Sequence, residues 1–417
     1  MEQTQYLIVG SSHAALEAIT AIRMHDGEGS ITLVTRDPHL PYSPTVLPYV
    51  VSGRSAPDNI ALRDAAFFEQ NRVGYRPGVA VTRLDTARKV AELADGSAIG
   101  YAKVVLATGA SPAIPPIPGL DQVSYHVLRT LDDATRLREA MQRSRQAVVL
   151  GAGLVGMHAA ENLVKAGANV TIVEMGPHLT SGYFDQTAAG LIEQAFVENG
   201  AKIRTRSRVV GLAPEGGEII VALEGGDTLR ADLLLVATGV RPELDYLDGS
   251  GVATDRGILV DDTMRTNVEG VWAAGDCAQA RSFYGDEPVM NAILPDATVQ
   301  GRIAGMAMAG DPGLKPYAGG VPLNTYHFFG RHAISVGSSA VPEGAQERVR
   351  FDPASGRHLK LIMKDGRLLG IYGVNEFFDA GVMAQLIQRR TDLSAVQDRL
   401  FEQPLTVGRE LMSQIWR

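Results

Sequence analysis

Cysteine is almost absent from this chain of 417 residues, in which Cys277 stands alone. A single thiol cannot form an internal disulfide, and it cannot supply the ligand set of a cysteine-held iron–sulfur cluster or zinc site. Redox relays built from cysteine pairs are therefore excluded within the chain. Any iron–sulfur centre that works with this protein must belong to another chain.

Two further features are missing: a concentrated basic region and a long apolar run. The chain has 39 Lys and Arg against 47 Asp and Glu, a formal net charge of −8, and both signs are interspersed. Nucleic-acid binding needs a concentrated basic face, so a nucleic-acid partner is not expected. No apolar run approaches the roughly 20 residues of a membrane span, and no signal peptide precedes Tyr6–Gly10. The sequence predicts no membrane association and a cytoplasmic protein.

A buried strand, a glycine turn, a helix and a second strand follow one another twice, and this order is typical of dinucleotide-binding units. The first copy has the strand Tyr6–Val9, the turn Gly10–Ala15, a helix to about Met24 and the strand Ile31–Val34. The second copy has the strand Ala147–Leu150, the turn Gly151–Gly156, a helix to about Ala166 and the strand Val170–Glu174.

Each copy is followed by an apolar strand that ends in Ala-Thr-Gly, at Val104–Gly109 and at Leu234–Gly239. Repetition of the pair predicts two homologous nucleotide domains. The proline-rich stretch Ser111–Gly119 is typical of a crossover between domains. Beyond residue 320, alternating strands such as His332–Val336 and Leu359–Met363 precede helical patterns, which indicates a smaller α+β domain.

The second glycine turn has the features of an NAD(H) site. Its glycines let the backbone approach a pyrophosphate at the N-terminus of the following helix. Glu174, at the end of the next strand, is placed to accept a hydrogen bond from a ribose 2′-hydroxyl and to repel a 2′-phosphate, so NAD(H) is favoured over NADP(H). The alternative is a tight turn followed by a surface Glu. The predicted NAD residues are Gly151, Gly153, Leu154, Val155, Gly156, Glu174 and Gly239.

The first glycine turn departs from the ideal pattern, because Ser12 and Ala15 replace the second and third glycines. Both residues are small enough for a phosphate to approach and for the helix to pack closely. We expect this turn to hold the adenosine half of FAD. The residue that contacts the ribose is left open between Thr35 and Asp37.

The segment Thr266–Asp276 is similar to the second FAD signature of the pyridine nucleotide-disulphide oxidoreductase superfamily. The resemblance implies that Asp276 binds the ribityl chain of the flavin, and that the helix carrying Ala297, Gln300, Gly301 and Gly305 directs its N-terminus at the flavin ring. The small residues of that helix are equally compatible with helix packing. The predicted FAD residues are Gly10, Ser12, His13, Ala14, Ala15, Thr35, Asp37, Val81, Thr108, Gly109, Asp276 and Ala297.

The predicted fold class is therefore α/β, with two Rossmann-like dinucleotide-binding domains of the three-layer type and a C-terminal α+β domain. The FAD domain is predicted to be discontinuous, over residues 1–115 and 240–320. The NAD domain is predicted over residues 116–239, and the C-terminal α+β interface domain over residues 321–417.

Members of the superfamily that reduce disulphides or peroxide carry a redox cysteine near the flavin, but Thr45 occupies the matching position here. A hydroxyl cannot form a mixed disulphide or a sulfenic acid. We interpret Cys277 as a buried small residue. Without a thiol, electrons must pass directly between the flavin and an external carrier, as in the NADH-dependent reductases of rubredoxin and ferredoxin that the chain resembles.

No side chain is certain to be catalytic, because hydride passes directly between the nicotinamide and flavin N5. Members of this branch often place a Glu near the nicotinamide, two residues after the third glycine, where this chain has His158. His158 is therefore a candidate nicotinamide-pocket residue. The alternative is a packing histidine on the buried side of its helix.

Residues 43–53, 149–168, 290–298 and 321–339 resemble the flavoprotein subunits of multi-subunit, NAD-linked 2-oxoacid oxidoreductases. The resemblance implies partner subunits that carry iron–sulfur clusters and thiamine diphosphate, and a role for this chain in passing electrons from the clusters to NAD+. Two alternatives stay open: a stand-alone NADH:rubredoxin or ferredoxin reductase, and a structural FAD-binding subunit without turnover.

Overall fold

The computed structural model describes residues 1–415, and contacts between elements divide the chain into two compact units. The first unit comprises Met1–Pro112, Arg129–Asp132 and Val240–Gly320, and the second comprises Ala113–Leu128, Asp133–Gly239 and the chain from Val321 onward. The first unit thus includes Arg129–Asp132, which lie within the range 116–239 predicted for the NAD domain. Residues 416 and 417 of the predicted C-terminal domain lie outside the described residues. The boundaries of the FAD, NAD and C-terminal domains stay a prediction.

The first unit is built on a sheet of order β3-β2-β1-β6-β5-β4, and β17 pairs with the last residues of β6, Val104–Leu106. Strands β1, β2, β3, β6 and β17 run parallel, and the β4–β5 hairpin joins β6 in antiparallel fashion. The strands are β1 Glu2–Val9, β2 Ile31–Val34, β3 Val73–Arg76, β4 Val81–Asp85, β5 Val90–Leu93, β6 Ala98–Leu106 and β17 Val271–Ala273. The smaller strands are β7 Ser111–Pro112, β15 Val240–Arg241, β16 Ile258–Leu259 and β18 Ala278–Gln279.

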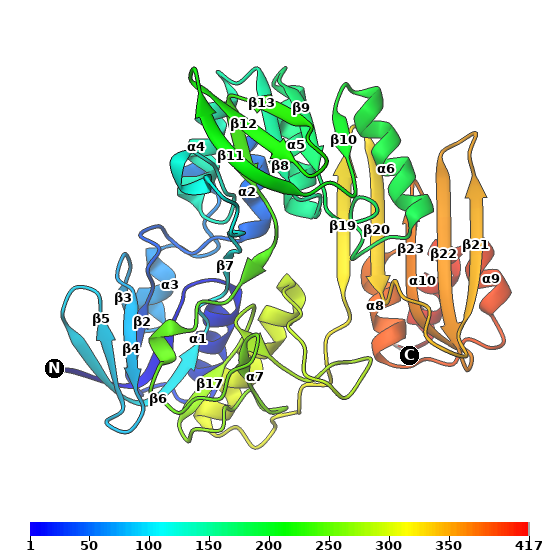
Figure 1. The fold of residues 1–417 in the computed structure, drawn as a ribbon. Helices are drawn as coiled ribbons and strands as arrows, with labels where there is room; N and C mark the ends of the chain where they lie inside the picture. Colours follow the sequence, from blue (N-terminus) through cyan, green and yellow to red (C-terminus); the bar gives the residue numbers. More distant parts are fainter. Residues whose placement is uncertain (416–417) are drawn as a thin grey trace. The chain divides into compact units, whose positions relative to one another are not determined.

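The helices α1 (His13–His25) and α7 (Leu294–Ala309) lie side by side in this unit (Figure 1). A Cβ atom on Gly301 would lie 2.2 Å from the carbonyl oxygen of Ala14, and one on Gly305 would lie 2.5 Å from that of Ala18. The two backbones are therefore in direct contact, and Gly301 and Gly305 have a packing role. The shorter helices of the unit are η1 Pro44–Val46, α2 Leu47–Val51, η2 Pro57–Asn59, α3 Ala65–Gln70 and η4 Asp245–Leu247.

The second unit contains a parallel sheet of order β10-β9-β8-β14 and an antiparallel sheet of order β11-β12-β13. The strands are β8 Gln146–Leu150, β9 Asn169–Val173, β10 Lys202–Arg204, β11 Val209–Glu215, β12 Glu218–Leu223, β13 Thr228–Ala231 and β14 Leu233–Val236. The helices are η3 Leu120–Gln122, α4 Leu131–Met141, α5 Leu154–Lys165 and α6 Gln186–Glu198. The first two residues of α4 belong to the first unit. Glu174 follows β9 directly instead of ending it.

The same unit holds the five-stranded antiparallel sheet β19-β20-β23-β22-β21, in yellow to orange in Figure 1, and the helices that pack on it. The predicted strands 332–336 and 359–363 fall within β20 and β22. The elements are β19 Leu323–Phe328, β20 Arg331–Gly337, β21 Gln346–Asp352, β22 Arg357–Lys364, β23 Arg367–Val374, α8 Ala380–Gln388, α9 Gln397–Glu402 and α10 Pro404–Ile415.

The repeated glycine turn and Ala-Thr-Gly segment of the sequence are spatial neighbours in both units. β6 lies parallel to β1, and β14 lies parallel to β8. A Cβ atom on Gly10 would lie 2.1 Å from the carbonyl oxygen of Ala107, and one on Gly151 would lie 2.4 Å from that of Ala237. Both glycines also have positive φ angles, +110° and +97°. The predicted fold class, with two Rossmann-like halves and a C-terminal α+β part, is confirmed.

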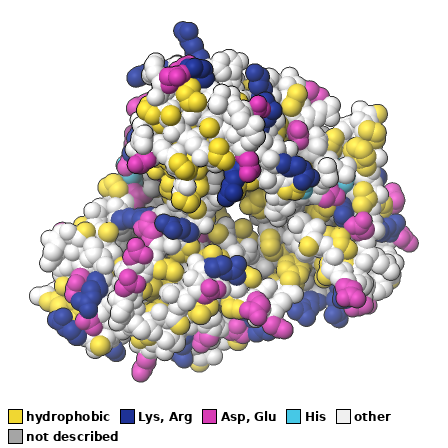
Figure 2. All heavy atoms as spheres, in the orientation of Figure 1, with side chains coloured by type: hydrophobic (Ala, Val, Ile, Leu, Met, Phe, Trp, Pro, Cys, Tyr) yellow, Lys and Arg dark blue, Asp and Glu magenta, His cyan; other side chains and the backbone are white. Residues whose placement is uncertain are grey.

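Acidic and basic side chains are interspersed on the face drawn in Figure 2, as the sequence suggests. Among residues 1–415, the structure has no helix that is long and apolar enough to cross a membrane.

Candidate cofactor sites

A pocket in the first unit lies at the carboxyl ends of β1, β2, β6 and β17. Ligands of open α/β sheets bind at such strand ends. The pocket is lined by residues from each sequence motif assigned to FAD. All the predicted FAD residues except Ala15 line it, namely Gly10, Ser12, His13, Ala14, Thr35, Asp37, Val81, Thr108, Gly109, Asp276 and Ala297. Ala15 is fully buried in the helix core. The individual roles of the predicted FAD residues stay predictions.

The helices that begin at this pocket and at the second glycine turn lack the side-chain caps found elsewhere. Helices α6 and α8 are capped by Asp185 and Asp379, which accept hydrogen bonds from backbone N–H groups of the first turn. Helices α1, α5 and α7 begin without a side-chain cap. Free N–H groups at a helix N-terminus bind anions such as a pyrophosphate. These three helix ends therefore fit the dinucleotides that the sequence predicts.

His13 further tests whether the pocket fits a polar cofactor. Its Nε2 atom is buried and has no hydrogen-bond partner in the described structure. The residue occupies the first position of α1 and lines the pocket. Burial lowers the pKa of His13, so its imidazole is neutral and one ring nitrogen remains to bond a ligand. An orphaned polar atom in this place fits a cofactor with polar groups.

The end of β2 holds both candidates for the ribose contact, and both are already hydrogen-bonded. The Thr35 hydroxyl accepts from the Ser11 hydroxyl at 3.1 Å and is buried. The Asp37 carboxylate accepts from the Tyr42 hydroxyl at 2.6 Å and from the backbone N–H of His39 at 3.0 Å. Burial, with this hydrogen bond to Asp37, raises the pKa of Tyr42. The choice between Thr35 and Asp37 stays open.

Arg129 is a pocket residue that the sequence reasoning missed. It comes from the short segment Arg129–Asp132, and its guanidinium donates to the Asp276 carboxylate at 2.8 Å. Both side chains are about one-fifth exposed, at 21% and 19%. An isolated Arg more than 100 positions from its partner leaves no spacing signal in a sequence. The pair presents one cation and one anion to the place predicted for the ribityl chain.

Hydroxyl groups occupy the position of the redox cysteine. The Ser43 and Thr45 hydroxyls lie 2.7 Å apart and line the same pocket. The single thiol, Cys277, is fully buried, and its Sγ donates to the backbone carbonyls of Leu106 and Ala274. Burial raises the pKa of the Cys277 thiol, so it is not poised as a nucleophile. This agrees with the interpretation of Cys277 as a small buried residue.

The second glycine turn, in the second unit, has the geometry of a phosphate site. A Cβ atom on Gly156 would lie 2.1 Å from the carbonyl oxygen of Gly151, so only glycine fits there. A Cβ atom on Gly153 would meet nothing within 4 Å, which leaves open space in front of the turn. Val155, at 46% exposed, and Gly239, with φ of +112°, are also accessible. Leu154 is the first residue of α5 and is partly buried.

Glu174 faces this turn, and its carboxylate already has backbone partners. One oxygen accepts from the N–H of Ala152 at 2.8 Å, and the other accepts from the N–H of Gly176 at 2.6 Å. The side chain thus fixes the turn. An ionised carboxylate has about four acceptor positions, so two bonds leave capacity for a ribose hydroxyl. The ribose contact stays a prediction.

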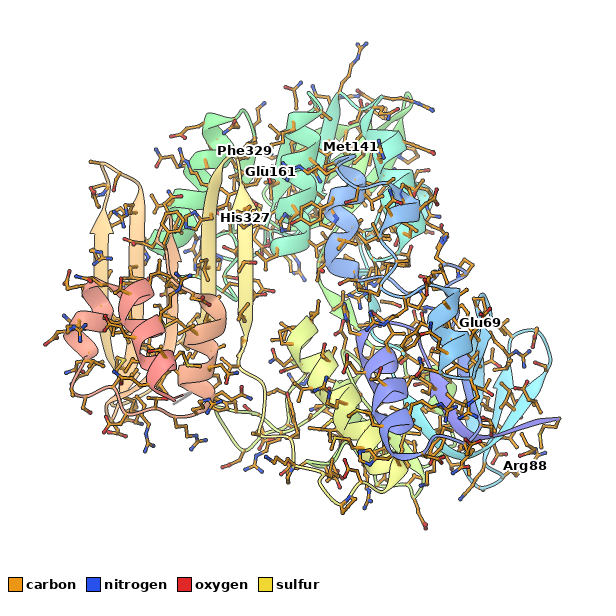
Figure 3. All side chains as sticks on the ribbon, turned by 180° about the vertical axis from the view of Figure 1, so that it is seen from behind. Glu69, Arg88, Met141, Glu161, His327 and Phe329 are labelled. Atoms are coloured by element: carbon orange, nitrogen blue, oxygen red, sulfur yellow. The ribbon has the colours of Figure 1, made fainter. Side chains whose placement is uncertain are left out.

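His158 packs edge-on against Tyr326 of β19, with ring centroids 4.8 Å apart. Burial lowers the pKa of His158. One turn further along α5, the Glu161 carboxylate accepts from Lys165 and from the backbone N–H of Phe329 at 2.8 Å, and Figure 3 shows Glu161 beside Phe329. These contacts pack His158 and Glu161 against β19 and the residue that follows it, and a role of His158 in a nicotinamide pocket stays a prediction.

The fold and the two glycine-turn sites define a class: oxidoreductases that hold two dinucleotides in successive Rossmann-like halves. The sequence profile of the pyridine nucleotide-disulphide oxidoreductases matches residues 4–304, and the chain belongs to this family. It is an oxidoreductase, and its cofactors are FAD and NAD.

Individual relatives narrow the class. The chain is 69% identical over 418 aligned positions to the epsilon subunit of NADH-dependent phenylglyoxylate dehydrogenase from Aromatoleum evansii, covering 100% of this chain and 99% of the relative. It is 28% identical to the ferredoxin–NAD(+) reductase component of the biphenyl dioxygenase system of Paraburkholderia xenovorans, with 94% of each chain covered. The covalent complex of putidaredoxin reductase with putidaredoxin contains a similar fold, with a TM-score of 0.84, 26% identity and 94% of each chain covered.

Proposed function

We propose that this chain is the FAD-containing electron-transfer subunit of a 2-oxoacid:NAD+ oxidoreductase. In the proposed reaction, phenylglyoxylate, coenzyme A and NAD+ give benzoyl-CoA, CO2 and NADH. The observation that carries the proposal is the 69% identity over the whole chain to a phenylglyoxylate dehydrogenase subunit. The cysteine content agrees with it, because iron–sulfur clusters must then lie on partner subunits.

FAD supplies the chemistry that joins single-electron carriers to hydride transfer with the nicotinamide. In the proposed assignment, the Gly10 turn and the uncapped N-terminus of α1 bind the FAD pyrophosphate, while Asp276 and Arg129 orient the ribityl chain. The Gly151 turn and α5 bind the NAD pyrophosphate, and Glu174 selects the unphosphorylated ribose. The hydroxyls of Ser43 and Thr45 cannot form a mixed disulphide or a sulfenic acid, so no thiol relay would stand between a bound flavin and the partner.

The proposed partners are subunits that carry iron–sulfur clusters and thiamine diphosphate. The word subunit in the relative's name supports a multi-chain assembly for that protein. The proposed location is the cytoplasm, where NAD(H) and coenzyme A are available to such an enzyme.

A second candidate is a stand-alone NADH-dependent reductase of ferredoxin or rubredoxin. It is favoured by the similarity, over 94% of the chain, to a ferredoxin–NAD(+) reductase component. This function needs the same two cofactors but an independent, diffusible iron–sulfur partner. A third candidate, a structural FAD subunit without turnover, conflicts with the close steric requirement for glycine at Gly151 and Gly156.

An anaerobic titration of the purified chain with NADH and NADPH, followed by flavin absorbance, tests both cofactor sites. We expect NADH to bleach the flavin at a much lower concentration than NADPH. A bound flavin that responds to neither nucleotide would favour the structural subunit. Bleaching by both nucleotides at equal concentration would contradict the proposed role of Glu174.

Reconstitution distinguishes the two electron-transfer functions. The chain is combined with the purified cluster-containing subunits proposed as its partners, and NADH formation is followed with phenylglyoxylate and coenzyme A. We expect NADH only when all components are present. Rapid NADH-dependent reduction of a free ferredoxin, with no oxoacid-dependent activity in the complex, would support the stand-alone reductase instead.

A further inference from the structure

Asp296 is a buried carboxyl group beside the FAD pocket that the proposed function does not use. It lies in the first turn of α7 and is 6% exposed, and the next residue, Ala297, lines the pocket. The side-chain amide of Asn291 donates to its carboxylate. A Cβ atom on Gly320 would lie 1.8 Å from the same carboxylate, so the backbone of Gly320 closes over it.

A network of buried polar side chains connects Asp296 to the pocket wall. The Tyr317 hydroxyl lies within hydrogen-bonding reach of both Asp296 and the Gln300 side chain. The Gln300 Oε1 atom accepts from the backbone N–H of Gly275 at 2.9 Å, and Gly275 lines the pocket beside Asp276. Tyr317 and Gln300 are only 4% and 2% exposed. Both ends of this network therefore meet the pocket, one at Gly275 and the other at the first turn of α7.

The environment of Asp296 differs from that of Asp276, which is paired with Arg129. The groups that act on the Asp296 carboxyl are neutral: Tyr317, from the segment after α7, and Asn291, from the loop before it. Burial raises the pKa of Asp296 to about 6, and the hydrogen bonds from Tyr317 and Asn291 only partly oppose this effect. A carboxyl group of this kind changes its protonation state near neutral pH.

The position of the flavin ring follows from the proposed FAD site. The adenosine half is assigned to the end of β2 and the pyrophosphate to the Gly10 turn. The family resemblance implies that Asp276 would hold the ribityl chain and that the N-terminus of α7 would face the flavin ring, so a ring bound there would lie near the first turn of α7. We propose that Asp296 is a redox-linked proton site, which takes up a proton when the flavin is reduced and so makes reduction easier as the pH falls. This inference rests on the proposed FAD site.

The proposed coupling balances in atoms and charge. NADH gives its hydride to FAD and leaves as NAD+, which adds negative charge to the flavin. In a buried region this charge raises the proton affinity of a nearby carboxylate. One proton then moves from solvent to the Asp296 carboxylate, and it returns to solvent when the electrons leave. The sign follows: proton uptake accompanies reduction at pH values between the Asp296 pKa of the oxidised protein and the higher Asp296 pKa of the reduced protein.

The experiment measures the two-electron midpoint potential of the bound flavin in the purified chain across this pH range. One additional proton per reduction changes the equilibrium tenfold per pH unit, or about 30 mV for a two-electron couple. In Asp296→Asn, we expect the slope of the midpoint potential against pH to be smaller by up to about 30 mV per pH unit. Tyr317→Phe removes a hydrogen bond to the carboxylate, so the pH range in which the midpoint potential falls more steeply should move to higher pH. Asp286→Asn removes an exposed acid from the same region of the chain and should keep the wild-type slope.

Equal slopes in the wild type and Asp296→Asn would overturn the inference, while bound, reducible FAD in both would leave the proposed function intact. Purified chain that binds no FAD would contradict the FAD site itself. If Asp296→Asn does not fold, the reduced-minus-oxidised infrared difference spectrum of the wild type decides. A protonated carboxylic acid band that appears on reduction, and whose intensity is lower in Tyr317→Phe, supports the inference. An unchanged carboxylic acid region of the spectrum overturns it.

Discussion

At the scale of single residues, the two glycine turns solve the same steric problem with different side chains. Gly10 and Gly151 both place their Cα against the alanine carbonyl of an Ala-Thr-Gly segment, and both need glycine. At the third position the copies differ: Ala15 is accommodated in the core, whereas a Cβ atom on Gly156 would meet the carbonyl of Gly151. The pattern alone could not show which departures from glycine are tolerated.

Gly156→Ala is therefore expected to displace the second glycine turn and weaken NADH binding, with the FAD content unchanged. The 2.1 Å approach to a backbone oxygen cannot be relieved by moving a flexible side chain. We expect an increase in the Kd for NADH of roughly tenfold or more, about 1.4 kcal/mol. Stopped-flow flavin reduction at varied NADH concentration measures it.

The matched control for this change is Gly190→Ala in the middle of α6. A Cβ atom there meets nothing within 4 Å, so NADH binding should stay the same and the helix should gain about 0.5–1 kcal/mol. If Gly156→Ala bound NADH as tightly as this control, the steric argument would be wrong.

Arg129→Ala is expected to weaken FAD retention, because it leaves the part-buried Asp276 carboxylate without its cation. Loss of a hydrogen bond to a charged group costs about 1.5–3 kcal/mol, so the Kd for FAD should rise roughly tenfold to a hundredfold. Flavin released on dilution of the purified variant reports the change. Arg399→Ala, which breaks the exposed pair with Glu410, should retain FAD like the wild type.

At the scale of elements, the hairpin turns show where backbone conformation requires glycine. The β22–β23 turn has Asp365 and Gly366 at φ of +49° and +70°, which matches the Asp-Gly preference of two-residue hairpins. A Cβ atom on Gly366 would also lie 2.0 Å from the Ser394 hydroxyl, and the Gly366 carbonyl accepts from the N–H of Leu393. This turn thus joins the sheet to the segment after α8.

Gly366→Ala is expected to lower the free energy of unfolding by more than the 1–2 kcal/mol or so of a left-handed residue alone. The comparison is Gly217→Ala, in the β11–β12 turn of the same unit, where φ is +89° and nothing lies within 4 Å of a Cβ atom. Urea unfolding of the two variants measures the difference. Equal losses would show that the contact with Ser394 relaxes at no cost.

At the scale of the whole molecule, several histidines are held neutral inside the protein. Burial is the main cause that lowers the pKa of each of them, His13, His126, His158 and His358. His358 is fully buried, neither ring nitrogen has a hydrogen-bond partner in the described structure, and the carboxylate of Asp185 lies 3.9 Å from it. The unfolded chain therefore binds protons that the folded chain resists.

Stability is accordingly expected to fall as the pH drops below the ordinary histidine pKa of about 6.5, because protonation then favours the unfolded chain. The loss should become complete below the lowered pKa values of the folded state. The thermal midpoint, measured between about pH 7.5 and 5.5, should decrease in the wild type and decrease less in His358→Phe. The same slope in both proteins would show that His358 does not contribute.

By itself, the sequence determined the fold class and two dinucleotide sites, because strand periodicity and the doubled glycine and Ala-Thr-Gly motifs are local signals. The resemblance of Thr266–Asp276 to an FAD signature then identified the flavin. The sequence also determined the absence of a thiol relay. Only the tertiary structure showed that Gly301 and Gly305 pack against α1, that Arg129 meets Asp276, that Glu174 holds the Gly151 turn and that Asp296 is buried beside the pocket. Each of these depends on contacts between residues distant along the chain, or on burial by them, and such contacts leave no periodicity or spacing in a single sequence.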